Sequence, residues 1–106
     1  MDAHEHLPLA PRDLLILAVL AEGPLHGYGL IKSVEARSES GVLLDPANLY
    51  RVLRRMTRLR WIRRTAGGDS RRRTYEVTAD GRAVLTAELA RLERLLDQAK
   101  PAVAGG

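Results

Sequence analysis

The chain has 106 residues and no cysteine, so it is long enough for one domain with a modest core, and it excludes disulfides, thiolate metal sites and a cysteine nucleophile. Lysine and arginine number 17 against 13 acidic residues, and residues 51–73 alone hold ten arginines and one acid, while both flanks are slightly acidic. This concentrated positive charge predicts a polyanionic partner, nucleic acid first, with a solvated arginine-rich face as the alternative that composition does not exclude.

The first residues predict a flexible arm followed by a buried helix. Residues 1–10 hold His4 and His6 among charges and a proline, without helical or strand periodicity. Residues 11–22 begin with a proline that suits a first helical turn and are apolar on nearly all sides, which predicts a buried helix that Gly23-Pro24 ends. Its apolar run is too short to cross a bilayer and no basic segment precedes it, so we expect a soluble, cytoplasmic protein with no membrane partner.

The next two helices are predicted from their periodicity and their caps. Over residues 26–37 the apolar side chains form one inward stripe of Tyr28, Leu30, Ile31 and Val34. Residues 42–44 are then expected to form a short extended connector. The following helix has the clearest start in the chain, because Asp45 suits an N-cap and Pro46 suits the first helical position.

This third helix is half apolar and half cationic. Its apolar residues recur at spacings of three and four and define one buried face, made of Leu49, Val52, Leu53, Met56 and Leu59. The opposite face carries Asn48, Arg51, Arg54, Arg55 and Arg58, with Tyr50 on its flank. Trp61 follows the helix and is expected in the core, with a pocket between two protomers as the alternative.

A hairpin and a long helix are predicted for the remaining residues. Residues 62–66 and 72–77 read as two strands around a Gly-Gly-Asp-Ser turn, with an arginine-rich tip. A final helix runs from Thr78, an N-cap, to about Lys100, where Pro101 breaks it. Its leucines form a heptad seam that a lone short helix would not need, made of Leu85, Leu89, Leu92 and Leu96.

Three helices followed by a hairpin is the element order of a winged helix-turn-helix. We therefore expect a mainly α fold with a small β-hairpin. Residues 11–78 would form the DNA-binding domain, residues 79–100 a C-terminal dimerisation helix and residues 101–106 a tail. In this architecture the third helix enters the major groove, and the hairpin tip lies along the backbone or the minor groove.

The candidate DNA contacts lie on the third helix and on the tip of the hairpin. They are Ala47, Asn48, Tyr50, Arg51, Arg54, Arg55, Arg58, Arg71, Arg72 and Arg73. The amide of Asn48 suits an adenine edge, and Arg51 or Arg54 suits a guanine edge. Tyr50, Arg55 and Arg58 are expected to hold phosphates. About two of the three hairpin arginines would face DNA if the strand is extended, because side chains alternate in direction.

Three segments resemble the winged-helix domain of PadR-type transcriptional regulators. They are GPLHGYGL at 23–30, DPANLYRVLRRM at 45–56 and RRRTYEVTADGR at 71–82, and the resemblance covers about residues 12 to 96. It implies a homodimeric repressor, with dimer contacts from the last helix and DNA contacts from Tyr50 and the basic wing. It also leaves open a small-molecule effector that releases the DNA.

Two positions depart from the pattern of that family. Arg51 stands where many members have a proline, which adds a charge to the DNA-facing side of the third helix. Arg60 stands where many have a glycine at the end of this helix, so a left-handed conformation there would cost about 1 kcal/mol.

Several other functions are disfavoured. The three histidines, His4, His6 and His26, make a poor metal site, and no cofactor is expected. No nucleophile with a base and no paired carboxylates in an apolar setting are apparent, so an enzyme is not expected. Charged residues of the last helix, including Glu88 and Arg91, are expected on a solvated face.

Two alternatives remain open from the residues alone. Leu85 and Leu89 fit the protomer's own core as well as an interface, whereas Leu92 and Leu96 are assigned to a partner protomer. The main alternative function is a winged-helix protein–protein interaction module without sequence-specific DNA binding. RNA binding ranks third, because Tyr50 is the one candidate for a stacking aromatic.

Overall fold

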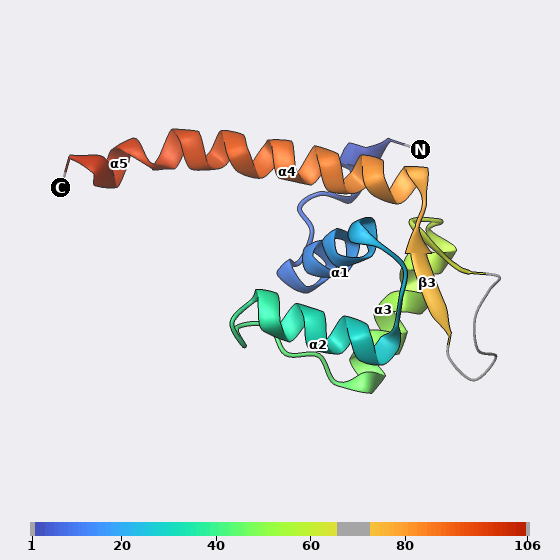
Figure 1. Ribbon diagram of the computed structural model, residues 1–106. Helices are drawn as coiled ribbons and strands as arrows, with labels where there is room; N and C mark the ends of the chain where they lie inside the picture. Colours follow the sequence, from blue (N-terminus) through green and yellow to red (C-terminus); the bar gives the residue numbers. More distant parts are fainter. Residues whose placement is uncertain (1, 66–72, 106) are drawn as a thin grey trace.

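Helices and a small antiparallel sheet enclose one apolar core in the computed structural model, which describes residues 2–65 and 73–105 (Figure 1). In chain order the elements are η1 Ala3–His6, α1 Pro11–Glu22, β1 Leu25–His26, α2 Gly27–Arg37, α3 Pro46–Arg58, β2 Ile62–Arg64, β3 Thr74–Val77, α4 Ala79–Ala99 and α5 Pro101–Ala104. The mainly α fold class with a small β component is confirmed.

The predicted start of α3 is confirmed in detail. The carboxylate of Asp45 accepts a hydrogen bond from the Asn48 amide at 2.8 Å, and Pro46 occupies the first turn. The apolar face of α3 is buried in the core through Leu49, Val52, Leu53 and Met56. The cap and the apolar period therefore fix both where α3 begins and which face it buries.

The end of α3 carries a left-handed residue at the position where the sequence departs from the glycine of the family that it resembles. Arg60 has a φ of 64°, and the Trp61 amide reaches back to the carbonyl of Met56 at 3.0 Å. This is the hydrogen-bonding pattern of a helix end that usually has glycine at the left-handed position. Arg60 thus adopts a conformation that L-residues rarely take.

The inward stripe predicted for α2 is wrong at one position. Leu30 and Val34 are buried, but the side chain of Tyr28 is 66% exposed. Gly27 takes the inward position instead, because a Cβ there would lie 3.3 Å from the Tyr50 hydroxyl. Since Gly27, Leu30 and Val34 follow the helical repeat on one side, Tyr28 is rotated towards solvent. The start of α2 therefore lies directly against the first turn of α3.

The sheet has the strand order β1-β3-β2, and both pairs are antiparallel. The β2 and β3 strands of the predicted hairpin are confirmed, with Ile62 opposite Val77 and Arg64 opposite Tyr75. The predicted turn and tip, residues 66–72, lie outside the described residues. The sequence did not predict β1, which pairs Leu25 with Tyr75, because two residues cannot show a strand period.

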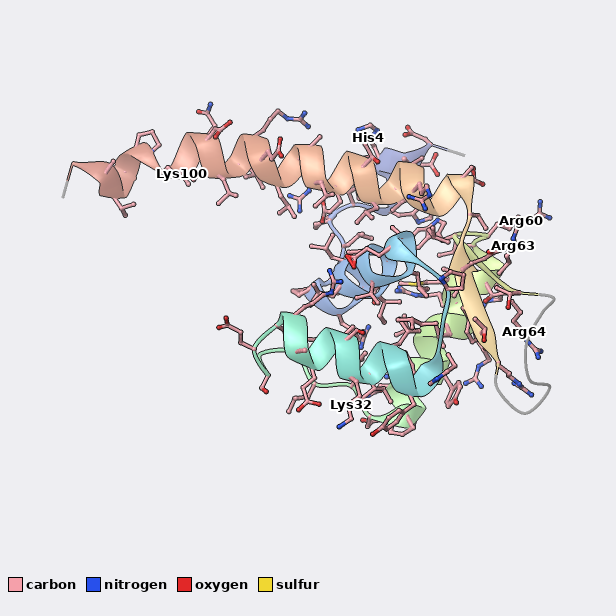
Figure 2. The ribbon with its side chains drawn as sticks, in the orientation of Figure 1. His4, Lys32, Arg60, Arg63, Arg64 and Lys100 are labelled. Atoms are coloured by element: carbon pink, nitrogen blue, oxygen red, sulfur yellow. The ribbon has the colours of Figure 1, made fainter. Side chains whose placement is uncertain are left out.

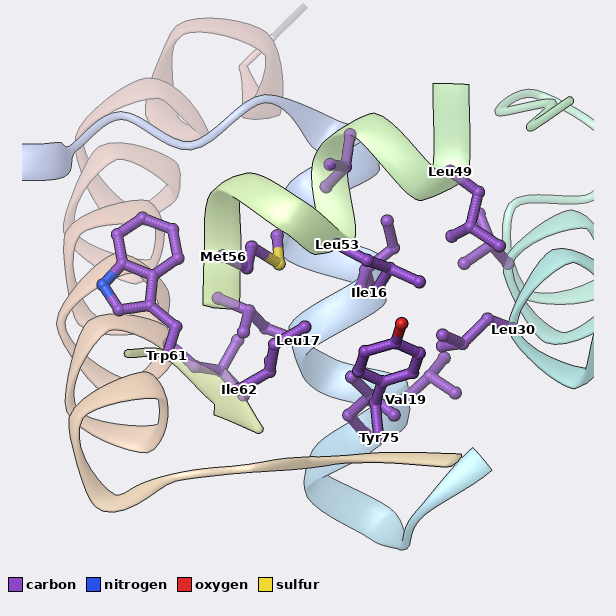
Figure 3. Packing of buried hydrophobic residues seen from close by; sticks show 14 of the residues in the cluster. Ile16, Leu17, Val19, Leu30, Leu49, Leu53, Met56, Trp61, Ile62 and Tyr75 are labelled. Atoms are coloured by element: carbon purple, nitrogen blue, oxygen red, sulfur yellow. The ribbon is translucent and has the colours of Figure 1, made fainter. Parts of the chain in front are cut away.

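The core lies between α1, α3 and the sheet, with α4 along one side (Figure 3). Trp61 is 2% exposed, which confirms its predicted place in the core. Its neighbours in Figure 3 come from separate elements: Leu17 from α1, Met56 from α3 and Ile62 from β2. The core thus holds α3 firmly while leaving its outer face free.

The helix α4 projects beyond the body of the protein (Figure 1). Thr78 caps it as predicted, with its hydroxyl accepting from the Gly81 amide at 3.1 Å. The sequence suggested that an irregular tail begins at Pro101. This prediction is wrong, because Lys100 stays helical and α5 follows directly. Proline is tolerated in a first helical turn, where no amide donor is needed. Within residues 2–65 and 73–105, no helix is long and apolar enough to cross a membrane.

The N-terminal segment is not the loose arm that its sequence indicated. Residues Ala3–His6 form a short 3-10 helix, and Leu7 and Leu9 pack against the core. The Leu9 amide donates a 2.7 Å hydrogen bond to Glu88 of α4, and the His6 ring meets Trp61 edge-on, with 5.1 Å between centroids. These contacts are tertiary and have no sequence period, so pattern analysis could not detect them.

Candidate nucleic-acid interface

The outer face of α3 brings together most of the predicted DNA contacts. Ala47, Tyr50, Arg51, Arg54 and Arg58 are all exposed. Asn48 is half-buried, and its amide group is engaged at both ends: it donates to Asp45 at 2.7 Å and accepts from Arg51. The first two turns of α3 thus present an ordered polar surface. Cationic residues extend it to the end of the helix.

Arg55 differs from its neighbours on α3. Its guanidinium donates to the carboxylate of Asp13 in α1, and Asp13 is only 4% exposed. The Arg12 guanidinium also reaches this carboxylate, at 3.2 Å. The phosphate role predicted for Arg55 is therefore in competition with a structural one, because a buried carboxylate without its cation is costly.

A second group of cations lies beside α3 at the edge of the sheet. The side chains of Arg54 and Arg58 share a surface hollow of about 270 Å³ with Arg64 and Arg73. Sequence analysis missed Arg64. The strand alternation could have indicated it, because Arg64 follows Ile62 by two positions and so shares its face. Of the predicted hairpin contacts, Arg73 is exposed here, and Arg71 and Arg72 lie outside the described residues.

The predicted dimer residues divide into two sets along α4. Leu85 is 8% exposed and belongs to the protomer's own core, so it is not available to a partner. Leu89 and Leu96 are 47% and 53% exposed, and Leu92 is half-buried. Leu95, which the seam did not include, is 51% exposed. The apolar surface of α4 therefore begins at Leu89.

Glu88 is not on a solvated face, as the sequence indicated, but is 1% exposed. It accepts hydrogen bonds from Arg91 at 2.5 Å and from the Leu9 amide at 2.7 Å. The bond from Arg91 is the main cause that lowers the pKa of Glu88 below its ordinary value of 4.5, although burial opposes it. The charged carboxylate therefore ties the N-terminal segment to α4.

Within residues 2–65 and 73–105, no three histidine or acidic side chains are grouped closely enough to hold a metal ion. The interface described here is made of cations, amides and hydroxyl groups, which suit an anionic polymer.

The arrangement is that of a winged helix-turn-helix protein, with α2 and α3 as the helix-turn-helix, the sheet as the base of the wing and α4 as an added helix. The model of the transcriptional regulator PadR-like family matches residues 16–87. The chain belongs to this family, whose members are transcriptional regulators rather than enzymes.

Solved structures agree on the fold. A PadR-like transcriptional regulator from Bacillus cereus superposes with a TM-score of 0.75 at 20% identity, covering 89% of this chain and 92% of that one. A transcriptional regulator from Clostridium thermocellum gives a TM-score of 0.71 at 24% identity, covering 86% and 91%. Bacillus subtilis PadR, solved in complex with operator DNA, gives 0.64 at 24% identity, covering 77% and 47%.

One curated relative is more similar in sequence. It is a 37.1 kDa protein in transposon TN4556 of Streptomyces fradiae, 35% identical over 82 residues. The match covers 77% of this chain and 23% of the relative, so the chain spans about a quarter of the relative's length.

Proposed function

We propose that this protein is a sequence-specific DNA-binding regulator that acts as a homodimeric repressor on an inverted-repeat operator. The observation that supports the proposal is that α3 has one buried face and one cationic face. Its inner face is fixed in the core by Leu49, Leu53 and Met56, while its outer face exposes Arg51, Arg54 and Arg58. A rigid helix with one cationic face is the element that a major groove about 12 Å wide accepts.

The first turns of α3, the recognition helix of this proposal, are suited to reading bases. Ala47 is small enough for the backbone to approach the DNA closely. Asn48 and Arg51 are already hydrogen-bonded to each other, so they are ordered before DNA arrives. Preorganised side chains lose less conformational entropy on binding. Arg51 or Arg54 is assigned to a guanine edge, and Tyr50 and Arg58 to phosphates.

The comparison with Bacillus subtilis PadR supports this proposal, because that protein was solved with operator DNA. The two proteins share the fold. The DNA-binding role is carried to this chain as part of the proposal and rests on the cationic face of its own α3.

The proposed dimer is formed through α4. The helix leaves the body of the protomer (Figure 1) and carries Leu89, Leu92 and Leu96 on one side, of which Leu89 and Leu96 are exposed and Leu92 is half-buried. Apolar side chains that recur every three to four residues on a projecting helix are the usual basis of helix pairing. Two recognition helices related by the resulting two-fold would meet half-sites about 34 Å apart. A small-molecule effector would act by binding the DNA-competent and incompetent dimers unequally.

The double substitution Arg51→Ala with Arg54→Ala tests the base contacts. Loss of the guanine contact is expected to weaken operator binding by about 1–3 kcal/mol and to relax specificity at its base pair. Arg94→Ala, an exposed arginine far along α4, is the matched control and should leave affinity within about 0.5 kcal/mol. Mobility shifts measure affinity, and circular dichroism confirms the fold.

Salt dependence tests the phosphate contacts of the same interface. If each protomer neutralises about four phosphates, the slope of log affinity against log salt is about −7. A slope near zero, or a double variant that binds as tightly as the Arg94 control, would contradict the proposal. It would instead favour an interaction module with solvated arginines.

A further inference from the structure

We propose that the hollow between α3 and the sheet is a phosphate-binding pocket, which holds one backbone phosphate of the DNA on each protomer. This inference rests on the proposed function for the source of the phosphate. The pocket has a volume of about 270 Å³ and is lined by Arg54, Thr57, Arg58, Arg64, Arg73 and Tyr75. It adds Arg64, which nothing in the sequence pattern of the recognition helix indicated, to the DNA-binding residues.

The backbone explains why these side chains converge. Arg54 and Arg58 are four residues apart on α3, so they lie one above the other on the same side. Arg64 stands opposite Tyr75 across the β2–β3 pair, and opposite residues project from the same face. Tyr75 is 6% exposed and marks the edge of the core. Figure 2 shows Arg64 at the edge of the sheet, and the lining of the pocket puts its side chain with those of Arg54 and Arg58 from α3.

The charges in the pocket are unbalanced within the described residues. Among residues 2–65 and 73–105, no ion pair joins Arg54, Arg58, Arg64 or Arg73 to an acidic side chain, whereas the arginines next to Arg54 and Arg64 are paired. On α3, Arg55 is bonded to Asp13. On β2, Arg63 is bonded to Glu76 at 2.7 Å. The two elements thus neutralise the arginines on their other sides and leave the pocket positive.

A bound anion would stabilise this cluster of arginine side chains. Guanidinium groups stay protonated at any physiological pH, so the pocket cannot reduce its repulsion by losing a proton. The hydroxyl of Thr57 already donates to the Leu53 carbonyl at 2.7 Å, so its proton is not available to a ligand. Guanidiniums bind phosphate oxygens through paired N–H donors, and phosphate is the anion to which this donor set is best matched.

The position of the pocket favours a DNA phosphate over a free one. It is continuous with the face of α3 that the proposed function puts in the major groove, since Arg54 and Arg58 belong to both. A helix in that groove is flanked by sugar–phosphate strands. The pocket lies on the sheet side of α3, where one of these strands would run.

The test compares Arg64→Gln with Arg63→Gln. Both changes remove one positive charge from adjacent positions of β2, but Arg63 is bonded to Glu76 outside the pocket. On the wild-type operator and on a mixed-sequence duplex, Arg64→Gln should weaken binding about 5- to 20-fold at low salt and make the salt slope shallower by about 1. Arg63→Gln should change the affinity less than twofold. Equal effects of the two variants would overturn the proposal.

A methylphosphonate scan locates the phosphate. Each duplex replaces one backbone phosphate by a neutral methylphosphonate, and one position in each half-site should weaken the wild type about as much as Arg64→Gln does. At that position the Arg64→Gln protein should lose no further affinity. If every position weakens the variant and the wild type equally, Arg64 holds no DNA phosphate.

These arms separate the pocket from the proposed function. If the wild type shows no operator preference and the slope of log affinity against log salt is shallower for Arg64→Gln alone, the repressor proposal is wrong and the pocket proposal stands. If the wild type prefers its operator and Arg64→Gln behaves as Arg63→Gln does, the repressor proposal stands and the pocket proposal is wrong. Titration with inorganic phosphate, followed by the arginine Nε–H signals in NMR, covers the free ligand. Shifts at Arg64 and Arg73 without any effect on DNA binding would overturn the assignment to DNA.

Discussion

The buried carboxylate of Asp13, in α1, accepts a hydrogen bond from the guanidinium of Arg55, in α3. The bond joins the helix at the centre of the core to the helix that presents the cationic face. Because Asp13 is 4% exposed, its charge depends on Arg55 and Arg12 for compensation. The bond therefore fixes the position of α3 relative to the rest of the domain.

Asp13→Asn is expected to lower the free energy of unfolding by about 2 kcal/mol, because it removes the buried charge that pairs with Arg55. The loss stays near this size because Arg55 is partly exposed to water. The free energy of unfolding from urea denaturation measures this. Asp97→Asn, an exposed carboxylate on α4, is the matched control. A loss no larger than that of the control would show that the bond does not anchor α3.

Glu88 predicts a specific dependence of stability on pH. Its folded-state pKa is below the ordinary value of 4.5 because of Arg91 and the Leu9 amide. The carboxylate therefore contributes stability above about pH 4.5, and this contribution is lost as the pH falls through the folded pKa. Glu88→Gln should lower the free energy of unfolding by about 1–3 kcal/mol at pH 7 and should change it little near pH 3. Denaturation curves from pH 7 to 3 test this, and parallel curves for the two proteins would contradict it.

Gly81 is expected to tolerate no side chain. A Cβ there would lie 2.1 Å from the carbonyl oxygen of Trp61 and 2.7 Å from Val77, so the first turn of α4 would have to move away from the sheet. We expect Gly81→Ala to cost about 2–4 kcal/mol. Gly23→Ala meets nothing within 4 Å and should be neutral or slightly stabilising. Similar thermal midpoints for the two variants would refute this packing.

The exposed leucines of α4 predict the oligomeric state. Leu92→Glu with Leu96→Glu should give folded monomers, because charges would replace the apolar surface of the proposed pair. Leu85→Ala should instead lower stability by about 2–4 kcal/mol, since Leu85 is buried in the protomer. Sedimentation or light scattering measures the mass. A wild type that is already monomeric, or a double variant of unchanged dimeric mass, would rule out this interface.

Local features could be predicted from the sequence. Asp45 and Pro46 identify the start of α3 because capping depends on a few adjacent residues. The left-handed Arg60, with its φ of 64°, lies at a position that the resemblance to the family singled out, because a glycine is usual at such a helix end. The cationic face of α3 followed from its period, as did the burial of the opposite face.

Tertiary features could not be predicted from the sequence. Glu88 belongs to a charged stretch of the sequence, yet it is buried because the amide of Leu9, 79 residues away in sequence, donates a hydrogen bond to it. Tyr28 is exposed because Gly27, which carries no side chain, packs closest to α3. Strand alternation indicates the face of Arg64, but its place beside Arg54 and Arg58 depends on how the sheet packs against α3. Each depends on how separate elements meet, which periodicity does not encode.

The most direct test of the central claim is selection of genomic DNA fragments by the purified protein at physiological salt, followed by mobility shifts on the enriched site and a scrambled control. We predict enrichment of a two-fold symmetric sequence with half-sites about one helical turn apart, bound at least about 1000-fold more tightly than the control. Equal, salt-sensitive binding to every fragment would contradict the claim. It would reduce the cationic face of α3 to a non-specific patch.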